Sequence, residues 1–241
     1  MKNIFKILGF CILVFASFKS VIADETYSSR ALVTATEEAV LSSEISAKIT
    51  SIPFQSGDYF KKNDALVQFD CSLFQAQTEV VKSEYESAII TLKNNTELAE
   101  MRSIGLYEVE LAQSAVNKAE AELEIARLNT KRCTIKAPYN GRVAKVYVNE
   151  YESIERQQPL IEIIGSGILE AQLLVSSKWL SWLVKDYPIK ILVDETKKTY
   201  DATIESIGAN IDPVSQTIDI TARFLENHES LLPGMSGTAS F

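Results

Sequence analysis

Two stretches of this sequence repeat one apolar pattern and decide the fold: AKITSIPFQSGDYFKKNDALVQFD at residues 47–70 and GRVAKVYVNEYESIERQQPLIEI at residues 141–163. Alternating apolar and β-branched residues with polar turns between them predict short strands in both stretches. Each half has too little apolar surface to fold alone, so we expect the two halves to share one small core. The matched apolar positions, at a constant offset of 94 residues, are Ile49, Ile52, Phe54, Phe60, Leu66 and Phe69 in the first stretch and Val143, Val146, Val148, Ile154, Leu160 and Ile163 in the second.

A long helical segment lies between the two halves. Residues 71–131 contain no proline and only one glycine, Gly105, and they are rich in good helix formers. Apolar and small residues recur there in narrow seams with a seven-residue repeat, a pattern typical of a coiled coil. The first seam is Phe74, Thr78, Val81, Tyr85, Ala88 and Leu92, and the second is Val109, Ala112, Val116, Ala119, Leu123 and Ala126.

A break near residues 94–105 would divide this segment into two helices. Asn94 and Asn95 are weak helix formers, and Gly105 is weaker still. Two helices of about 28 residues, each about 40 Å long, would then form an antiparallel hairpin. One continuous helix in a parallel dimer would also satisfy the seams. The repeat argues against that alternative, because only a hairpin returns the chain to its start and lets the two halves meet.

The N-terminus has the layout of a secretory signal peptide. Lys2 and Lys6 precede an apolar stretch at residues 7–18, which is shorter than the roughly 20 apolar residues that span a bilayer. We expect cleavage after Ala23, so that residues 1–23 are removed on export. The alternative is an uncleaved inner-membrane anchor. Cys11 lies inside the apolar stretch without lipobox-like residues before it, which disfavours a lipid anchor.

Export would leave Cys71 and Cys133 as the two cysteines of the mature chain. They flank the helical segment at positions that an antiparallel hairpin brings together. An even pair in an exported protein predicts a disulfide, which would close the base of the hairpin. Two buried, unpaired thiols are the alternative.

The rest of the sequence predicts a small β-barrel, because several short strands with one small helix are typical of that architecture. Pro233 and Gly234 fit the central positions of a type II turn, and residues 29–36 are expected to add a strand to the barrel. The other strands are expected at residues 169–175, 189–193, 200–207, 218–224 and 238–241, with a short helix at residues 176–185.

Composition and motif content exclude several kinds of function. The net charge of -8 argues against nucleic acid and anionic membrane surfaces as main partners, because both need clustered positive charge. The single histidine, His228, lies in a polar loop without the neighbours that a general base or a metal ligand needs. The sequence contains no spacing typical of a catalytic triad or a phosphate-binding loop. We therefore predict no enzymatic activity, no cofactor and no metal site.

The order of the segments resembles the HlyD-like membrane fusion proteins, most closely the periplasmic adaptors of RND-type efflux pumps. The resemblance is carried by residues 47–70, by CTIKAPYNGRVAKVYV from Cys133 with its Ala-Pro-x-x-Gly turn, and by IDPVSQTIDITARF and LLPGM within residues 211–241. It implies an elongated α+β fold. A lipoyl-like β domain would be split by an inserted antiparallel coiled-coil α-hairpin, and a small β-barrel domain would follow.

The resemblance and the patterns together give the expected domain boundaries. They are a signal peptide at residues 1–23, an N-terminal strand joining the barrel at 24–38, lipoyl-like halves at 39–70 and 133–165, the α-hairpin at 71–132 and the barrel at 166–241.

For function, the resemblance implies a non-catalytic adaptor in the periplasm, associated with the inner membrane. It would link an RND-type transporter to a TolC-like outer-membrane channel and would assemble as a ring, commonly a hexamer. The hairpin tip would contact the channel through Leu98, Met101, Arg102, Ile104, Gly105 and Leu106. A membrane-proximal domain is expected to be missing after the barrel, so that transporter contact would fall to the barrel.

One stretch of the hairpin departs from the family pattern. Adaptors that dock to TolC-like channels often carry an Arg, a Leu four residues later and a Ser seven residues beyond. Leu98 fits the Leu position, but Asn94 and Gly105 stand where the Arg and the Ser would be. We therefore expect the docking chemistry at this tip to differ from the usual one.

Three other functions stay open. The chain could be the adaptor of an ABC exporter or type I secretion system, which usually retains an N-terminal membrane helix. It could be a lipoyl or biotinyl carrier domain modified at Lys61 or Lys62, although solvated surface lysines are the simpler interpretation. It could also be a structural coiled-coil protein without a role in transport.

Overall fold

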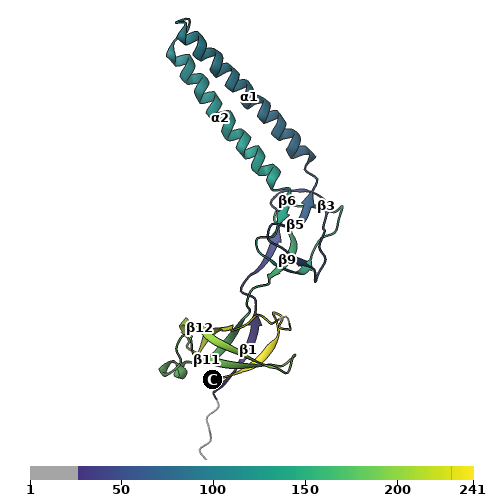
Figure 1. Cartoon of the computed structure of the whole chain (residues 1–241), viewed down its shortest axis with the longest axis vertical. Helices are drawn as coiled ribbons and strands as arrows, with labels where there is room; N and C mark the ends of the chain where they lie inside the picture. The colour runs from purple at the N-terminus through teal and green to yellow at the C-terminus, as the bar shows by residue number, and fades with distance from the viewer. Residues whose placement is uncertain (1–26, 229) are drawn as a thin grey trace, which may run out of the picture.

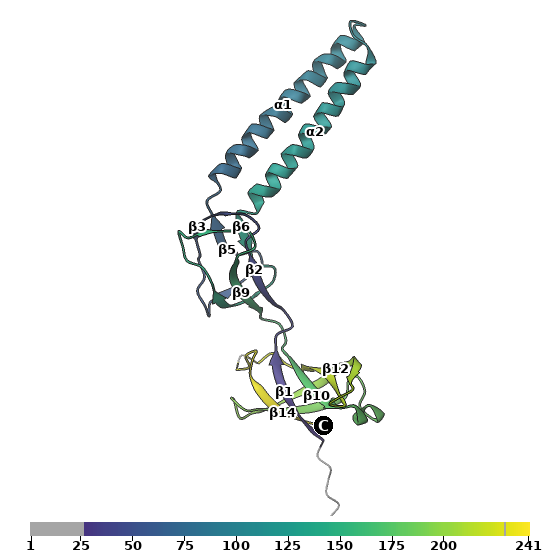
Figure 2. The same cartoon turned by 180° about the vertical axis from the view of Figure 1, so that it is seen from behind.

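The computed structural model describes residues 27–228 and 230–241, so the expected signal peptide lies outside the described residues. The molecule is elongated, with two long helices projecting from a group of short strands and a β-barrel at the opposite end (Figures 1 and 2). The carbonyl oxygen of Tyr27 accepts a hydrogen bond from the backbone N–H of Phe241 (3.0 Å). The first and last described residues therefore lie together at the barrel end. Neither helix of the described residues is long and apolar enough to cross a membrane. The predicted combination of helices with a small β-barrel is confirmed.

The barrel closes from six antiparallel strands in the order β1-β10-β13-β12-β11-β14. Side chains along β10, β11 and β13 alternate between buried and exposed, as expected when one face of a strand lines a core. The predicted N-terminal strand takes its place in the ring between β10 and β14. The strands are β1 (Ser28–Thr34), β10 (Glu170–Ser176), β11 (Pro188–Val193), β12 (Thr199–Asp212), β13 (Thr217–Phe224) and β14 (Ser236–Ser240).

The helix predicted over residues 176–185 is shorter than expected. A 3₁₀ helix, η1 (Ser177–Ser181), begins after Ser176, whose side chain accepts a hydrogen bond from the backbone of Lys178 (3.4 Å). It ends at Trp182, and Leu183 is only 2% exposed because it packs into the barrel core. Burial of Leu183 therefore overrides the local preference for a longer helix.

Between the helices and the barrel lie two four-stranded sheets, in the orders β2-β9-β7-β4 and β6-β5-β3-β8. We call them the sheet module. Each sheet takes two strands from the segment before the helices and two from the segment after them. The strands are β2 (Glu38–Ser42), β3 (Ala47–Ser51), β4 (Tyr59–Phe60), β5 (Ala65–Phe69), β6 (Thr134–Lys136), β7 (Gly141–Val146), β8 (Ser153–Ile154) and β9 (Pro159–Gly165).

The sequence repeat is also a repeat of backbone structure. Strands β3, β4 and β5 begin 94 residues before β7, β8 and β9 respectively. The backbone of Gly57 donates to Val143 (2.8 Å), and the equivalent bond runs from Tyr151 to Ile49 (3.0 Å). Gly57 and Tyr151 also share positive φ values of 98° and 66°. The two halves therefore exchange equivalent hydrogen bonds and are related by an approximate two-fold symmetry.

The matched apolar positions build one core, as the repeat predicted. All twelve belong to a single cluster, in which Ile52, Phe54 and Val146 are half-buried and the others are buried. Because this core takes side chains from both halves, neither half has a complete core of its own.

Gly141, the glycine of the Ala-Pro-x-x-Gly motif, has a steric reason to be glycine. It pairs with Gly165 where β7 meets β9. A Cβ atom at Gly141 would overlap the carbonyl oxygen of Ile164 and lie 2.9 Å from the ring of Phe60. The close approach of β7 to β9 therefore requires a residue without a side chain at this position.

Helices α1 (Ser72–Glu100) and α2 (Leu106–Lys131) lie side by side and are joined by a short turn at residues 101–105 (Figures 1 and 2). We call α1, this turn and α2 the helical arm. The break falls at the C-terminal end of the interval predicted from the sequence, and Asn94 and Asn95 remain inside α1. The side chain of Asn95 donates to the carbonyl oxygen of Glu108 on α2 (3.3 Å), a contact that holds it in the helical arm.

Candidate functional site: the helical arm

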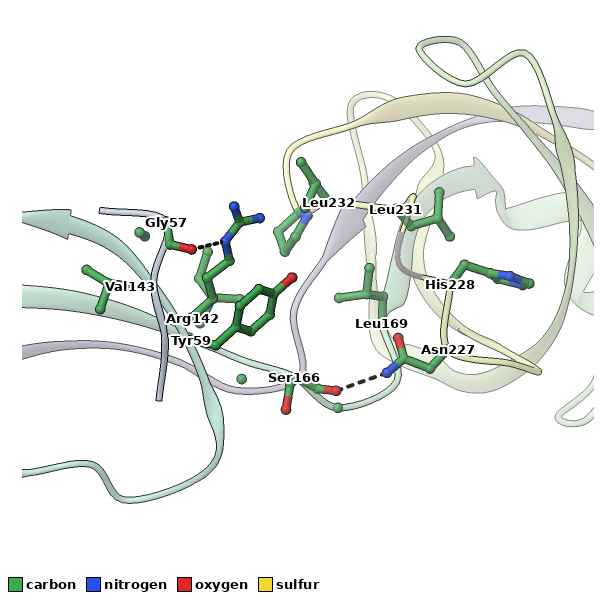
Figure 3. Close-up of a pocket in the computed structure, with 15 residues that line it drawn as sticks. Gly57, Tyr59, Arg142, Val143, Ser166, Leu169, Asn227, His228, Leu231 and Leu232 are labelled. Carbon is green, nitrogen blue, oxygen red and sulfur yellow. Dashed lines mark hydrogen bonds between the residues drawn. The ribbon is translucent and has the colours of Figure 1, made fainter. Parts of the chain in front are cut away.

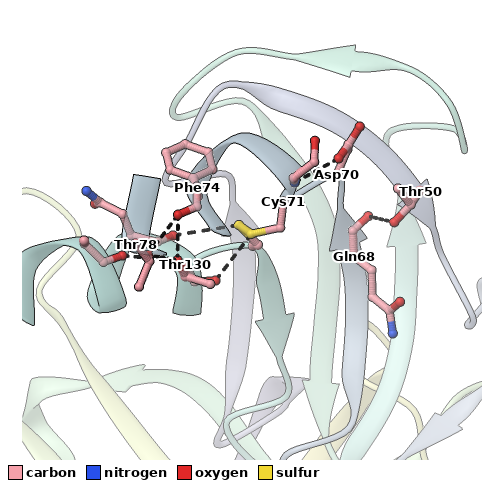
Figure 4. The surroundings of a disulfide bond; sticks show 11 residues. Thr50, Gln68, Asp70, Cys71, Phe74, Thr78 and Thr130 are labelled. Atoms are coloured by element: carbon pink, nitrogen blue, oxygen red, sulfur yellow. Dashed lines mark hydrogen bonds between the residues drawn. A yellow bond between two sulfur atoms is a disulfide. The ribbon is translucent and has the colours of Figure 1, made fainter. Parts of the chain in front are cut away.

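The base of the helical arm is closed by a bond between Cys71 and Cys133 (Figure 4). Their Cα atoms are 5.8 Å apart although the two residues are separated by 62 positions in sequence. This separation lies within the range that a disulfide requires. The structure therefore brings together the two cysteines that the sequence analysis paired.

Hydrogen bonds between α1 and α2 reinforce the base next to the disulfide (Figure 4). The hydroxyl oxygens of Thr78 and Thr130 are 2.9 Å apart, and Thr130 also lies 3.3 Å from the carbonyl oxygen of Phe74. These contacts join residues more than fifty positions apart, so they fix the start of α1 against the end of α2.

Asp70 supports the first turn of α1. Its side chain accepts a hydrogen bond from the backbone of Ser72 (3.1 Å). This backbone hydrogen bond is the main reason that the pKa of the Asp70 carboxyl lies below its usual value of 3.8. A hydrogen bond from the Ser72 hydroxyl lowers the pKa further, and the charge of Lys48 adds a smaller effect in the same direction. A negative charge just before the N-terminus of α1 also interacts favourably with the positive end of the helix dipole.

The seams predicted from the sequence face each other along the helical arm. The α2 seam contributes five buried residues, Ala112, Val116, Ala119, Leu123 and Ala126. The α1 seam positions are half-buried, and α1 has no fully buried residue. Because alanine occupies alternate positions of the α2 seam, α1 can approach it closely.

The turn at the far end of the helical arm presents apolar side chains to solvent. Met101 is 67% exposed and Leu106 is 76% exposed, whereas Leu98 is 39% exposed and Ile104 is half-buried. Arg102 adopts a positive φ of 59°, and Gly105 precedes the first residue of α2. All six tip residues predicted from the sequence therefore lie at or beside the turn.

Tyr107 was missed by the sequence analysis although it lies beside these residues and is 71% exposed. Tyr107 lies outside the α2 seam and next to the predicted break. An aromatic residue in such a position could have identified it as part of the tip.

Each helix also carries a second, outward-facing seam that the sequence analysis did not identify. On α2, Leu111 and Ile125 are 59% and 60% exposed, and on α1, Leu73 and Val80 are 75% and 55% exposed. These residues recur at the same heptad spacing as the inner seams, but on the opposite faces of the helices. We call them the outer seams; they comprise Leu73, Ala76, Val80, Ser83, Ser87 and Ile90 on α1 and Tyr107, Leu111, Ser114, Lys118, Ala121, Ile125 and Leu128 on α2.

The residues weighed for carrier or catalytic roles lie away from the helical arm. Lys61 and Lys62 are exposed at the turn between β4 and β5, where their backbone groups donate to Asp64 and Asn140. His228 lies between β13 and β14, with its ring centroid 4.7 Å from that of Tyr200.

No protein-family model matches the chain. Among curated proteins, it is 26% identical over 224 residues to the multidrug resistance protein MdtA of Xenorhabdus bovienii, covering 83% of this chain and 54% of that protein. It is 22% identical over 217 residues to the nodulation protein NolF of Rhizobium meliloti, covering 84% of this chain and 59% of that protein. The chain thus spans only about half the length of the curated relatives it matches.

Solved structures share the fold. A MacA–MexA chimeric protein, containing the Pseudomonas aeruginosa MexA α-hairpin domain, superposes with a TM-score of 0.77 at 17% identity, over 89% of this chain and 80% of that chain. The membrane fusion protein Spr0693 of Streptococcus pneumoniae superposes with a TM-score of 0.73 at 18% identity, over 88% of this chain and 97% of that chain. By fold, and by sequence similarity along most of its length, the chain is identified as a relative of the HlyD-like membrane fusion proteins.

Proposed function

We propose that this protein is a periplasmic adaptor of an efflux system, which links an RND-type transporter in the inner membrane to a TolC-like channel in the outer membrane. The observation that carries the proposal is the helical arm, which projects from one end of a β-rich body and ends in exposed apolar residues. The similarity to multidrug resistance protein MdtA supports a role in efflux. An adaptor needs surfaces rather than reactive groups, so the proposed role includes no catalysis and no cofactor.

The division of the chain follows from the repeat. We infer that residues 39–70 and 133–165 are the halves of a lipoyl-like domain, that residues 71–132 are an antiparallel coiled-coil hairpin inserted between them, and that residues 166–241 with the strand in 24–38 form the barrel domain. The exchange of equivalent hydrogen bonds between Gly57, Val143, Tyr151 and Ile49 supports the split domain. The facing heptad seams support the coiled coil.

The tip of the helical arm would contact the channel. Met101 and Leu106 expose most of their surface, and burial of exposed apolar area is the main driving force for docking between proteins. Arg102, held at a positive φ, would add a positive charge to this contact. Tyr107 extends the same surface along the first turn of α2 and has the amphipathic side chain that is enriched in interfaces.

The outer seams would join copies of the chain side by side. One seam lies on α1 and the other on α2, on faces directed away from each other, so a contact between them uses two different surfaces. Such a head-to-tail contact closes into a ring when the rotation between neighbours permits. The outer seams therefore support assembly of the adaptor as a ring, in which the barrel, at the end opposite the helical arm, would contact the transporter at the inner membrane.

Photo-cross-linking in cells tests the proposed docking. A photoreactive amino acid at Met101 should capture an outer-membrane protein. The same amino acid at Glu79, whose side chain is 73% exposed on α1 near the base, should not capture that protein. Capture of the same outer-membrane protein from both positions, or from neither, would contradict a channel contact at the tip.

A further inference from the structure

A cavity of about 510 Å³ lies between the sheet module and the barrel (Figure 3). Its volume is within the range of small-molecule sites, which occur preferentially at domain interfaces. One wall comes from β4, β7 and the adjoining turn, and the other from Leu169 and the loop between β13 and β14, with residues 164–167 as the link between them.

Arg142 supplies the positive charge of this cavity. Its Nε atom donates to the carbonyl oxygen of Gly57 (2.6 Å), which fixes the guanidinium at the wall of the sheet module. The guanidinium carbon lies 5.2 Å from the ring centroid of Tyr59. No carboxylate of the described residues forms an ion pair with Arg142. The terminal amino groups of the guanidinium therefore remain available to a ligand.

The opposite wall is apolar. Leu169 and Leu231 are 7% and 4% exposed and form a firm surface, and Leu232 is 46% exposed at the rim. The ring of His228 points away from Arg142 and packs on Tyr200, so it lies apart from the guanidinium (Figure 3). The apolar wall faces the guanidinium across the cavity.

A hydrogen bond holds the two walls in place before any ligand binds. The side chain of Asn227 donates to the carbonyl oxygen of Ser166 (3.0 Å), so the barrel loop is tied to the link between the two modules (Figure 3). A cavity that is already formed requires less ordering when a ligand enters, which favours affinity.

We propose that this cavity binds an amphipathic anion, with its apolar body against Leu169, Leu231 and Leu232 and its acidic group on the guanidinium of Arg142. The lining decides the sign of the ligand charge: although the protein carries 32 acidic residues, none of the described residues that line the cavity is Asp or Glu. Guanidinium binds carboxylate, sulfonate and phosphate groups in a planar, two-pronged geometry. A bound anion contacts both modules, so it holds them in one relative orientation, which goes beyond the adaptor role proposed above.

Two fluorescent probes with the same aromatic body test this site on the full chain. Anilinonaphthalenesulfonate carries a sulfonate, whereas phenylnaphthylamine is its uncharged counterpart. The wild-type protein should bind the sulfonate probe at one site per chain. Arg142→Gln should weaken that binding about tenfold or more, since a hydrogen bond to a charged group is lost. The affinity for the neutral probe should change less than about twofold, since the apolar wall is unchanged.

Two further variants keep the test decisive. Leu232→Glu places a carboxylate at an exposed position of the rim and should weaken binding of the sulfonate probe as strongly as Arg142→Gln. Lys48→Gln is the matched control, because Lys48 occupies the position equivalent to Arg142 in the other half of the repeat and does not line the cavity. It removes the same charge and should leave both affinities unchanged. Equal binding of the sulfonate probe by wild type and Arg142→Gln, or an equal loss for both probes, would overturn the proposal.

Discussion

Cys71 and Cys133 are 62 residues apart in sequence, yet their Cα atoms lie 5.8 Å apart at the base of the helical arm. The chain between the two cysteines runs away from the sheet module along α1 and returns to it along α2. The bond therefore holds together the two points at which the arm joins the strands, and it links β5 of one half to β6 of the other.

Removal of this bond should destabilise the base of the helical arm. The chain-entropy model gives on the order of 4 kcal/mol for a closed loop of this length. For a chain of this size, Cys71→Ser with Cys133→Ser should lower the melting temperature by about 10 °C. Differential scanning calorimetry with and without reductant measures the effect, and reductant should leave the double variant unchanged. Alkylation of both cysteines in the unreduced wild type would contradict the bond.

Gly141→Ala should destabilise the sheet module by about 1–3 kcal/mol, the usual cost of forcing an extra carbon into a packed site. The added Cβ would overlap the carbonyl oxygen of Ile164 and approach the ring of Phe60, so β7 and β9 would have to separate. Urea denaturation measures the loss. Gly167→Ala is the matched control, because a Cβ at Gly167 meets no atom within 4 Å, and it should have little effect. Equal stabilities for the two variants would contradict the steric role of Gly141.

The charge of Asp70 should make the stability of the helical arm depend on pH. Because the Ser72 hydrogen bonds lower the pKa of Asp70 from 3.8, the folded state binds this proton less tightly than the unfolded state. The stabilisation from the Asp70 carboxylate is therefore fully present when the pH is above the usual pKa of 3.8, and it is lost as the pH falls through the lowered pKa of the folded state. Asp70→Asn should melt below wild type at about pH 6, and the gap should narrow in acid. Thermal melts followed by circular dichroism test this, and a gap that stays constant into acid would contradict it.

The outer seams should control association between copies of the chain. Leu111→Glu with Ile125→Glu places charges at positions that are 59% and 60% exposed, so the folded monomer should keep its stability within about 0.5 kcal/mol. Self-association should weaken about tenfold or more, because two charges enter an apolar contact. Sedimentation velocity measures the association. Ala115→Glu, at an exposed position between the seams of α2, should leave it unchanged. Unaltered association of the double variant would exclude this surface.

Much of the fold was predictable because its main signals are periodic. The seam from Phe74 to Leu92 specifies one helix face, and the match between Ile49 and Val143 specifies equivalent strands. Both patterns depend only on which side chains are buried, and the spacing of apolar residues along the sequence indicates the buried face directly. The barrel strands followed from the same reasoning, since their side chains alternate between core and solvent.

Other features depend on contacts between distant segments, which no local pattern records. The position of the turn at residues 101–105 is one example: Asn94 and Asn95 favour an earlier break, but packing of α1 on α2 extends the helix past them. The exchange of strands between the two sheets is another, because it depends on hydrogen bonds such as that from Gly57 to Val143. The cavity beside Arg142 combines parts of four separate segments and had no signal in the sequence.

The proposed adaptor role depends most on the helical arm doubling back, and one distance tests this geometry directly. Spin labels at Gln77→Cys and Lys131→Cys, both exposed positions, can be placed in a Cys11→Ser chain, where the disulfide protects the remaining cysteines. Double electron–electron resonance should then give a separation below about 25 Å, since packed helices lie about 10 Å apart and the labels add their own length. A separation on the order of 80 Å, as in one unbroken helix, would contradict the return of α2 along α1.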